Sequence, residues 1–389
     1  MINFASRTKK VSPSPTLAIS AKAKKLKSEG KDVINFSAGE PDFDTPDFIK
    51  EKAIEAIKAG FTKYTPTTGI PELKQAISEK FKKDNALEYS PGQIVVSCGA
   101  KHSIFNILFA LIEKGDGVII VSPYWVSYPE MVNLCEGEVQ LIKTRPENNF
   151  KFTPAELKKN INAKTKLLIL NSPSNPCGSV YSKEELERIA EICVAKNIWV
   201  LSDEIYEKLV YDGLKHYSLA SLNQDIYNLT ATVNGVSKAY SMTGWRLGYL
   251  AGPPELVRRI CDIQDHSTSN PASISQKAAL AALQADSDFT KNMCAEFQKR
   301  RDYIVSRLDK IKKLSYVKPQ GAFYIFIDIS GCKMGSLEFA SRLLDETFVA
   351  VVPGKAFGMD NYVRISFATS LAQIEKGMNR IEEWLKKNG

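Results

Sequence analysis

The sequence predicts an α/β fold with a large domain whose mostly parallel, seven-stranded sheet is flanked by helices. Strand-like and helix-like segments alternate from about residue 45 to residue 283, and the strand-like segments are short apolar runs without period-two alternation. Such runs are typical of a parallel sheet that helices cover on both faces. After about residue 284 the pattern changes, which favours a second, smaller α+β domain.

Helix-starting and helix-ending residues predict where the helices of the large domain lie. Thr45 and Pro46 precede apolar residues at helical spacing and Gly60 follows them, so a capped helix is expected there. Pro71 opens another helix. A further helix is expected at 183–196. Seven strands are expected, at 94–97, 118–121, 139–142, 167–170, 198–201, 230–233 and 247–251.

The remaining elements belong to the smaller domain. A long charged helix is expected at 289–312, a strand at 322–328, a helix at 337–344, and strands near 349–352 and 362–367. The last helix keeps its apolar residues at helical spacing, namely Ile374, Met378, Ile381 and Leu385.

Composition places the chain among ordinary globular proteins. It has 389 residues, of which 44% are hydrophobic and 25% are charged, so two or three domains are expected. The 52 basic and 44 acidic residues give a net charge of +8, spread along the chain in short clusters. This excess fits an anionic small ligand or simple solubility, and because no basic recognition motif is present we expect no nucleic-acid partner.

The numbers and spacing of cysteines and histidines indicate the cellular compartment and whether a metal is bound. The seven cysteines are odd in number and form no Cys-x-x-Cys pair, which favours a reducing, cytoplasmic compartment. The start lacks the apolar stretch of a signal peptide, and the apolar run 104–112 is too short to span a bilayer, so no membrane association is expected. His102, His216 and His266 lack metal-ligand spacing, so we expect no bound metal.

Polar and aromatic residues follow successive predicted strands, at the sheet edge where ligands bind in open α/β folds. The turn Gly99-Ala100-Lys101 leads into a helix whose free N–H groups can hold an anion such as phosphate. Trp125, Asn175, Asp203 and Lys238 follow four other strands. Each has a common structural explanation by itself, as a turn former, a helix cap, a core aromatic or a solvated lysine. Their accumulation at one edge favours a functional site.

Several motifs resemble those of fold type I, class I aminotransferases, which use pyridoxal 5'-phosphate (PLP). They are 38–43 (AGEPDF), 64–69 (YTPTTG), 171–178 (NSPSNPCG), 202–206 (SDEIY), 237–249 (SKAYSMTGWRLGY) and 362–366 (YVRIS). Within that family, 122–129 (SPYWVSYP) resembles the bacterial aspartate aminotransferase branch. The motifs cover nearly the whole chain in the same order.

The resemblance implies a role for each matching residue. Lys238 resembles the lysine that bonds to the cofactor and moves the substrate proton, and Asp203 resembles the carboxylate that pairs with the pyridine nitrogen. Asn175 and Tyr206 resemble the pair that binds the ring 3'-oxygen, and Trp125 resembles the aromatic residue that stacks on the ring. The phosphate would be held by Gly99, Ala100, Lys101, Ser237 and Arg246.

Substrate contacts are implied in the same way. Arg364 resembles the arginine that binds the substrate α-carboxylate, a task that suits its planar fork. Gly39 resembles a residue whose backbone approaches the substrate, and Thr16 lies where this branch has a polar residue near the substrate side chain. In this branch Lys101 receives the distal carboxylate. The implied substrate-binding residues are Gly39, Lys101, Trp125, Asn175, Arg364 and Thr16.

The resemblance predicts an aspartate:2-oxoglutarate aminotransferase that works by a ping-pong mechanism on small amino acids and 2-oxo acids. An aromatic or prephenate aminotransferase, or another PLP enzyme on this fold such as a C–S β-lyase, would share every cofactor residue. Tyr64 resembles the residue that reaches the phosphate of the neighbouring subunit, which implies a homodimer with shared sites. The expected division is an N-terminal segment at 1–45 that joins the small domain, a PLP-binding domain at 46–283 and a small domain at 284–389. The small domain would thus contain both chain ends.

Overall fold

The computed structural model describes residues 4–12 and 15–388, with the side chains of residues 15–17 left out of the description. Its main feature is a seven-stranded sheet of order β2-β8-β7-β6-β5-β3-β4, in which β8 alone is antiparallel to its neighbours. All seven predicted strands form it. They are β2 (Ile94–Ser97), β3 (Gly117–Ser122), β4 (Glu138–Lys143), β5 (Thr165–Asn171), β6 (Trp199–Asp203), β7 (Thr230–Gly235) and β8 (Gly248–Ala251).

Helices cover both faces of this sheet, which explains its continuous apolar runs. In β5, Leu167 and Ile169 pack with the residues of α4, α5 and α9, whereas Leu168 and Leu170 pack with those of α6 and α7. The helices of this part are α2 (Asp47–Lys58), α3 (Pro71–Asn85), α4 (Ala100–Leu111), α5 (Ser127–Leu134), α6 (Pro154–Asn160), α7 (Lys183–Ala195), α8 (Gln224–Tyr227), α9 (Pro254–Asp265) and α10 (Ser273–Gln284).

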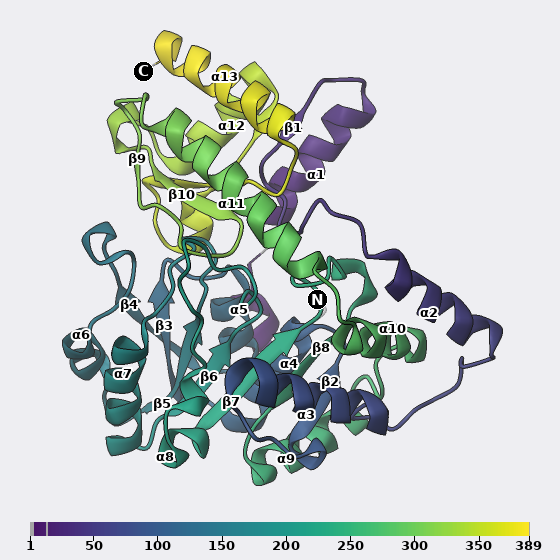
Figure 1. Ribbon diagram of the computed structural model, residues 1–389. Coiled ribbons are helices and arrows are strands. Elements are labelled where there is room, and N and C mark those ends of the chain that lie inside the picture. The colour runs from purple at the N-terminus through teal and green to yellow at the C-terminus, as the bar shows by residue number, and fades with distance from the viewer. Residues whose placement is uncertain (1–3, 13–14, 389) are drawn as a thin grey trace.

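A second, smaller body lies beyond the sheet, and the long helix α11 (Phe289–Leu308) runs into it (Figure 1). Its four-stranded antiparallel sheet has the order β12-β13-β10-β9. The other elements here are α1 (Pro15–Ser28), β1 (Ile34–Asn35), β9 (Ser315–Tyr316), β10 (Tyr324–Asp328), α12 (Ser336–Thr347), β11 (Val349–Ala350), β12 (Val352–Pro353), β13 (Tyr362–Ser366) and α13 (Leu371–Asn388).

Both chain ends contribute to this smaller body. Strand β1 pairs in parallel with β11, so a segment near the N-terminus lies against one near the C-terminus. The four apolar residues expected to anchor the last helix, Ile374, Met378, Ile381 and Leu385, are all buried. The fold is therefore the predicted α/β class with an additional α+β unit.

Two predicted elements differ from the structure. The strand expected at 349–352 is two strands, because the chain leaves the pairing with β1 after Ala350 and joins the second sheet at Val352. The sequence does not indicate this division, because residues 349–352 are all apolar and buried and no turn residue separates the two strands. The helix expected to reach residue 312 ends at Leu308, where hydrogen-bonded turns take over.

The order of the parallel strands places a crevice at the carboxyl edge. From β3 the chain moves outward to β4 and then returns past β3 to β5, so the direction of winding reverses between β3 and β5. Ligands in open α/β sheets bind at such a reversal. Among the described residues, no helix is both long and apolar enough to cross a bilayer.

Candidate active site

A cavity of about 330 Å³ lies at the carboxyl edge of the sheet. Side chains and backbone from the large sheet, from α4, from β10 and β13 of the smaller body and from the segment before α2 all line it. The structure thus brings together most of the predicted site residues, namely Gly39, Ala100, Lys101, Trp125, Asn175, Asp203, Tyr206, Ser237, Lys238, Arg246 and Arg364.

Asp203 ends β6 as a buried carboxylate with two donors. The Tyr128 hydroxyl donates to its Oδ2 over 2.6 Å, and the Ile205 N–H donates to its Oδ1 over 3.3 Å. Burial raises the pKa of Asp203 to about 6, and the hydrogen bond from Tyr128 opposes that rise. Above that pH the group is an anion inside the protein, which suits a cationic ligand atom.

Lys238 follows β7 and reaches the cavity from the neighbouring strand end. Its Nζ donates to the carbonyl oxygen of Gly39 over 2.6 Å. Burial lowers the pKa of Lys238 to about 8, and the charge of Glu40 opposes that change. An amine with this pKa is neutral in about a tenth of molecules at pH 7, far more than for an ordinary lysine, so it can act as a nucleophile or accept a proton.

An anion cradle forms where β8 meets the first turn of α4. Gly99 caps the helix with φ +88°, and a Cβ at Gly99 would meet Arg246 Nη2 at 2.5 Å. A Cβ at Gly248 would collide with the backbone nitrogen of Ala100, so glycine at this position lets strand and helix approach closely. Ser237 completes the polar lining. Helix N–H groups, a hydroxyl and a guanidinium together suit a phosphate.

Arg364 is a buried guanidinium held from two sides. Its Nη1 donates to Asn175 Oδ1 over 3.0 Å, and its Nη2 donates to the Ser37 carbonyl over 2.9 Å. Its guanidinium carbon lies 4.3 Å from the ring centre of Tyr324, whose hydroxyl lies 3.0 Å from that of Tyr206. Among the described residues no partner meets its buried Nε. That unpaired donor fits an incoming carboxylate.

Lys101 and Trp125 lie together on the wall of the same cavity. The Lys101 ammonium is 4.9 Å from the centre of the Trp125 ring system. Burial and, to a smaller extent, the charge of Arg246 lower the pKa of Lys101. Besides the fixed guanidinium of Arg364, the cavity therefore has a flexible cation that suits an anionic group.

Two predicted site residues, Gly99 and Tyr64, are not among the described residues that line the cavity. Tyr64 is 91% exposed, in the turn between α2 and α3. Thr16 belongs to α1, but its side chain lies outside the described part of the chain.

The structure adds cavity residues that the sequence did not single out. Tyr128 lies within the 122–129 motif, but the motif gave it no role. Tyr324 comes from an ordinary apolar strand, and no sequence signal distinguishes it from a core aromatic. The other polar additions are Ser20, Ser37, Asn171 and Thr243.

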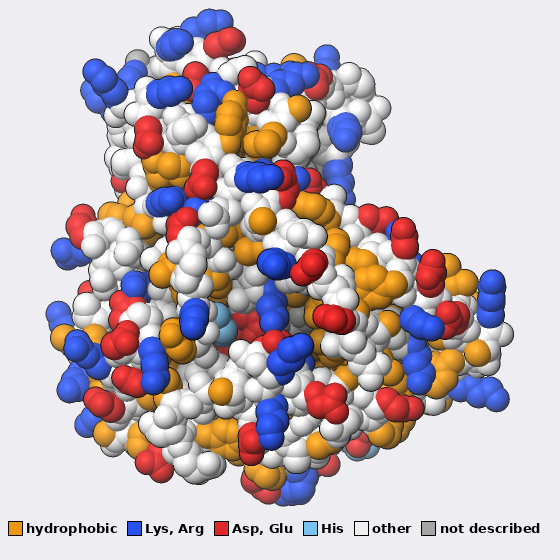
Figure 2. Space-filling model, in the orientation of Figure 1, with side chains coloured by type: hydrophobic (Ala, Val, Ile, Leu, Met, Phe, Trp, Pro, Cys, Tyr) orange, Lys and Arg blue, Asp and Glu red, His pale blue; other side chains and the backbone are white. Residues whose placement is uncertain are grey.

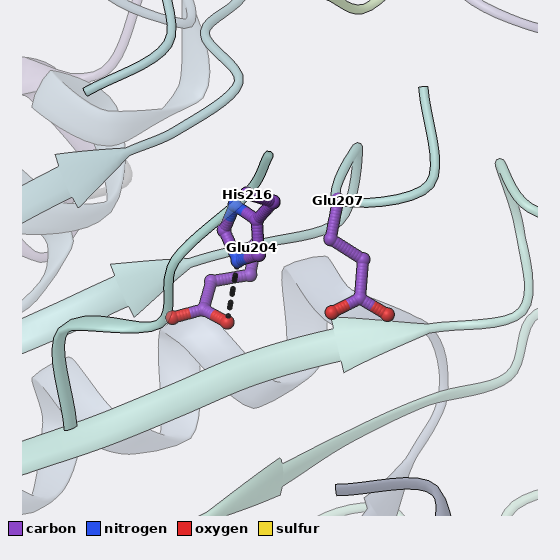
Figure 3. A group of neighbouring side chains, drawn as sticks. All are labelled: Glu204, Glu207 and His216. Carbon is purple, nitrogen blue, oxygen red and sulfur yellow. Dashed lines mark hydrogen bonds and ion pairs between the residues drawn. The ribbon is translucent and has the colours of Figure 1, made fainter. Parts of the chain in front are cut away.

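A separate cluster outside the cavity brings together Glu204, Glu207 and His216, whose potential ligand atoms lie within 4.8 Å of one another (Figure 3). His216 Nε2 is 3.1 Å from Glu204 Oε2. The Lys80 ammonium pairs with Glu207, and Asn85 donates to the same carboxylate over 2.7 Å. Burial alone would raise the pKa of Glu207, but the positive charges led by Lys80 hold it at about 2. Lys80 thus already neutralises the Glu207 carboxylate, the charge that a bound metal ion would otherwise balance.

Comparisons with known proteins agree with this geometry. The sequence profile of aminotransferase class I and II matches residues 31–381. An aspartate aminotransferase of Bacillus sp. (strain YM-2) is 49% identical, covering 98% of this chain and 99% of the relative. A probable aspartate/prephenate aminotransferase of Rickettsia conorii is also 49% identical, covering 98% of each chain.

The solved structures include an aspartate aminotransferase from Thermus thermophilus with maleate. It superposes with a TM-score of 0.95 at 41% identity, covering 98% of this chain and 100% of that one. At this level of identity over the full length, both the fold and the chemistry of the family are shared. The chain belongs to the class I and II aminotransferase family, and it is a PLP-dependent transaminase.

Proposed function

We propose that this transaminase moves the amino group of L-aspartate to 2-oxoglutarate. The observation that carries the proposal is the pair of cations in one cavity: Arg364 has an unpaired buried Nε, and Lys101 lies on the wall beside Trp125. Two cations in one cavity suit a substrate with two carboxylates. The relative from Bacillus carries the name of this activity, and maleate, found with the Thermus enzyme, is itself a four-carbon dicarboxylate.

The residues of the cavity fit PLP. Gly248 lets β8 approach the first turn of α4 closely, and the N–H groups of that turn lie beside the Arg246 guanidinium, which suits the cofactor phosphate. Asp203 offers a buried anion for a protonated ring nitrogen, and Lys238 offers an amine whose pKa is lowered to about 8. These features support Gly99, Ala100, Lys101, Ser237 and Arg246 as the phosphate ligands.

When bound, PLP supplies an aldehyde that bonds to amines and a ring that stores the negative charge left at the substrate Cα. In our proposal Lys238 holds and moves the proton at Cα, because its pKa allows a neutral Nζ near neutral pH. Arg364 fixes the α-carboxylate and so orients the Cα–H bond. Asn175 and Tyr206 would bind the ring oxygen, and Trp125 would pack against the ring face.

Closing the cavity would exclude water from the reaction. Gly39 contacts Lys238 directly, and Thr243 donates to Glu40 over 2.7 Å, so the segment before α2 covers the catalytic lysine. The pairing of β1 with β11 and the hydrogen bond from Arg364 to the Ser37 carbonyl support the proposed division into 1–45, 46–283 and 284–389, with the first segment joining the small domain. Thr16 would then approach the substrate from α1.

A homodimer is the assembly we propose. Tyr64 is 91% exposed, and a large aromatic side chain this exposed is available to contact a second copy. Hydrophobic side chains gather over α2, at the right-hand edge of Figure 2, where Ile54 and Ile57 are about half exposed. Phe109 is 55% exposed on α4. Contact with a second copy would cover these side chains and deliver Tyr64 to the partner's phosphate site.

We also propose a cytoplasmic location. All seven cysteines are free thiols, four of them buried, as is usual in a reducing compartment. The amino acids and 2-oxo acids of central metabolism are also available there. On the face shown in Figure 2, basic and acidic side chains are interspersed, which supports small-molecule substrates rather than a nucleic acid.

An amino-donor panel with 2-oxoglutarate as acceptor tests the proposal. Aspartate should give the highest kcat/KM, and Lys101→Met should lower the value for aspartate about tenfold or more while changing that for alanine little. Lys143→Met, which removes an exposed lysine at the end of β4, is the charge-matched control. Equal losses for aspartate and alanine in Lys101→Met would reject Lys101 as the distal anchor.

The same panel separates the second candidate. The Rickettsia relative bears the name of an aspartate/prephenate enzyme, and the lysine that we assign to the distal carboxylate is less directional than an arginine fork. If phenylalanine or prephenate equals aspartate in kcat/KM, the protein is an aromatic or prephenate aminotransferase. Elimination of sulfur from a cysteine conjugate, with no amino transfer, would indicate a C–S β-lyase.

A further inference from the structure

Tyr128 lines the cavity and contacts two of the proposed cofactor-binding residues. It lies in the first turn of α5, directly after the loop that carries Trp125, and its side chain is 2% exposed. Its ring meets Trp125 edge to face, with centroids 5.2 Å apart. Its hydroxyl points to Asp203, so one side chain links the proposed ring-stacking aromatic to the proposed ring-nitrogen partner.

The contact with Asp203 has the geometry of a strong hydrogen bond. The O···O distance of 2.6 Å lies in the range for a hydroxyl that donates to an ionised carboxylate. Among the described residues Tyr128 gives Asp203 its one side-chain hydrogen bond, and the other carboxylate oxygen has only the longer bond from the Ile205 N–H. Burial, together with the charge of Asp203, raises the pKa of Tyr128 well above its usual value. The phenol therefore remains a donor at every working pH.

We propose that Tyr128 is a positioning residue that holds the Asp203 carboxylate ionised and aimed at the ring nitrogen of the cofactor. The inference rests on the proposed function, in which Asp203 pairs with that nitrogen. Without the hydroxyl, the carboxylate would keep only the longer hydrogen bond from the Ile205 N–H, and burial would then favour the neutral acid. A neutral Asp203 would bind the cationic ring more weakly.

Other charged or titratable groups also face Asp203. They are Lys238 from the turn after β7, Glu204 directly after the end of β6 and Tyr206 from the following turn. The charge of Glu204 raises the pKa of Asp203, whereas Lys238 and Tyr128 lower it. Because Tyr128→Phe removes one of the groups that lower this pKa and keeps the ring, its effect on the carboxylate is separable from packing.

The test measures PLP affinity of the apoprotein across pH in Tyr128→Phe. We expect the dissociation constant to rise about tenfold or more near neutral pH, with the acid limb of the affinity profile moved to higher pH. Tyr89→Phe is the matched control: it also removes a buried phenol hydroxyl, bonded to Thr232 over 3.2 Å and outside the cavity. That control should keep both the affinity and the acid limb.

A double variant distinguishes positioning from packing. In an Asp203→Asn background, Tyr128→Phe should cost little further affinity, because no ionised carboxylate remains to be held. Equal costs in both backgrounds, or wild-type affinity with an unmoved acid limb in Tyr128→Phe, overturn the inference about Tyr128. If Asp203→Asn itself binds PLP with wild-type affinity, the proposed role of Asp203 fails instead. Should Tyr128→Phe not fold, Tyr128→His keeps a donor at this position and should retain more affinity than Tyr128→Leu.

Discussion

Two buried groups of opposite charge define this site at the residue scale. Asp203 ends β6 and Lys238 lies just after the neighbouring strand β7, and burial moves their pKa values toward each other, to about 6 and about 8. Between these values the carboxylate is ionised and a growing fraction of the lysine is neutral. Our proposal needs both states at once, since Asp203 would stabilise a cation and Lys238 would accept a proton.

The rate at which the apoprotein bonds covalently to PLP should follow the protonation state of Lys238. Only the neutral Nζ attacks the aldehyde, so the capture rate should rise with pH from about 6 and level off above about 8. An ordinary lysine, with a pKa near 10.4, would still gain rate beyond about pH 9. Stopped-flow absorbance at a series of pH values measures this, with Lys238→Ala as the blank. A rate that keeps rising steeply through about pH 10 would contradict a lowered pKa.

The site residues that follow a strand or belong to a motif could be predicted from the sequence. The residues that reach the cavity only because distant elements pack together could not. Lys238, Asp203 and Asn175 follow predicted strands, so their meeting at one edge follows from the fold. The contact between Tyr128 and Asp203 joins residues 75 positions apart through the seating of α5 on the sheet. Tyr324 reaches the cavity because the second body packs over it. No hydrophobic periodicity or motif in the sequence indicates where Tyr128 or Tyr324 lies.

At the scale of elements, the close approach of β8 to the N-terminus of α4 builds the anion cradle. Gly248 is required by this approach, because its Cβ would collide with the Ala100 backbone nitrogen, and Gly99 is favoured by its φ of +88° at the start of α4. Strand positions were predictable, since apolar runs covered on both faces are distinctive. Helix α1 was not expected, because its basic stretch from Lys22 to Lys27 resembles ordinary surface charge.

Gly248→Ala should weaken both fold and cofactor binding. The new Cβ would collide with the backbone of Ala100, and the overpacking should lower the free energy of unfolding by about 1–3 kcal/mol. Displacement of the helix turn should also raise the PLP dissociation constant. Urea unfolding of the apoprotein and PLP titration measure the two effects. Gly92→Ala, whose Cβ would lie 3.7 Å from Ser90 Oγ, is the control and should change neither quantity.

The whole molecule combines a rigid sheet with a cover made from distant parts of the chain. Strand β1 pairs with β11, and Arg364 on β13 donates to the Ser37 carbonyl, so the N-terminal segment is tied to the smaller body. Such long-range ties could not be read from the local sequence. In our account a second copy completes the site, because Tyr64 lies on the surface of its own chain.

Tyr64→Phe should therefore weaken PLP binding although Tyr64 does not line the cavity of its own chain. Loss of one hydrogen bond to a charged phosphate should raise the dissociation constant roughly tenfold. Tyr217→Phe removes another partly exposed tyrosine hydroxyl and should bind PLP normally. Sedimentation equilibrium should give the mass of a dimer for both variants. A monomeric wild-type protein with full activity, or unchanged affinity in Tyr64→Phe, would rule out the shared site.

The central claim is that Lys238 moves the proton in amino-group transfer within this cavity. The most direct measurement is the rate of amino exchange between aspartate and 2-oxoglutarate by Lys238→Ala at saturating PLP. The account predicts a loss of about 10²- to 10⁴-fold or more, with a folded protein that still binds the cofactor through its phosphate cradle. Exchange at the wild-type rate would contradict the account.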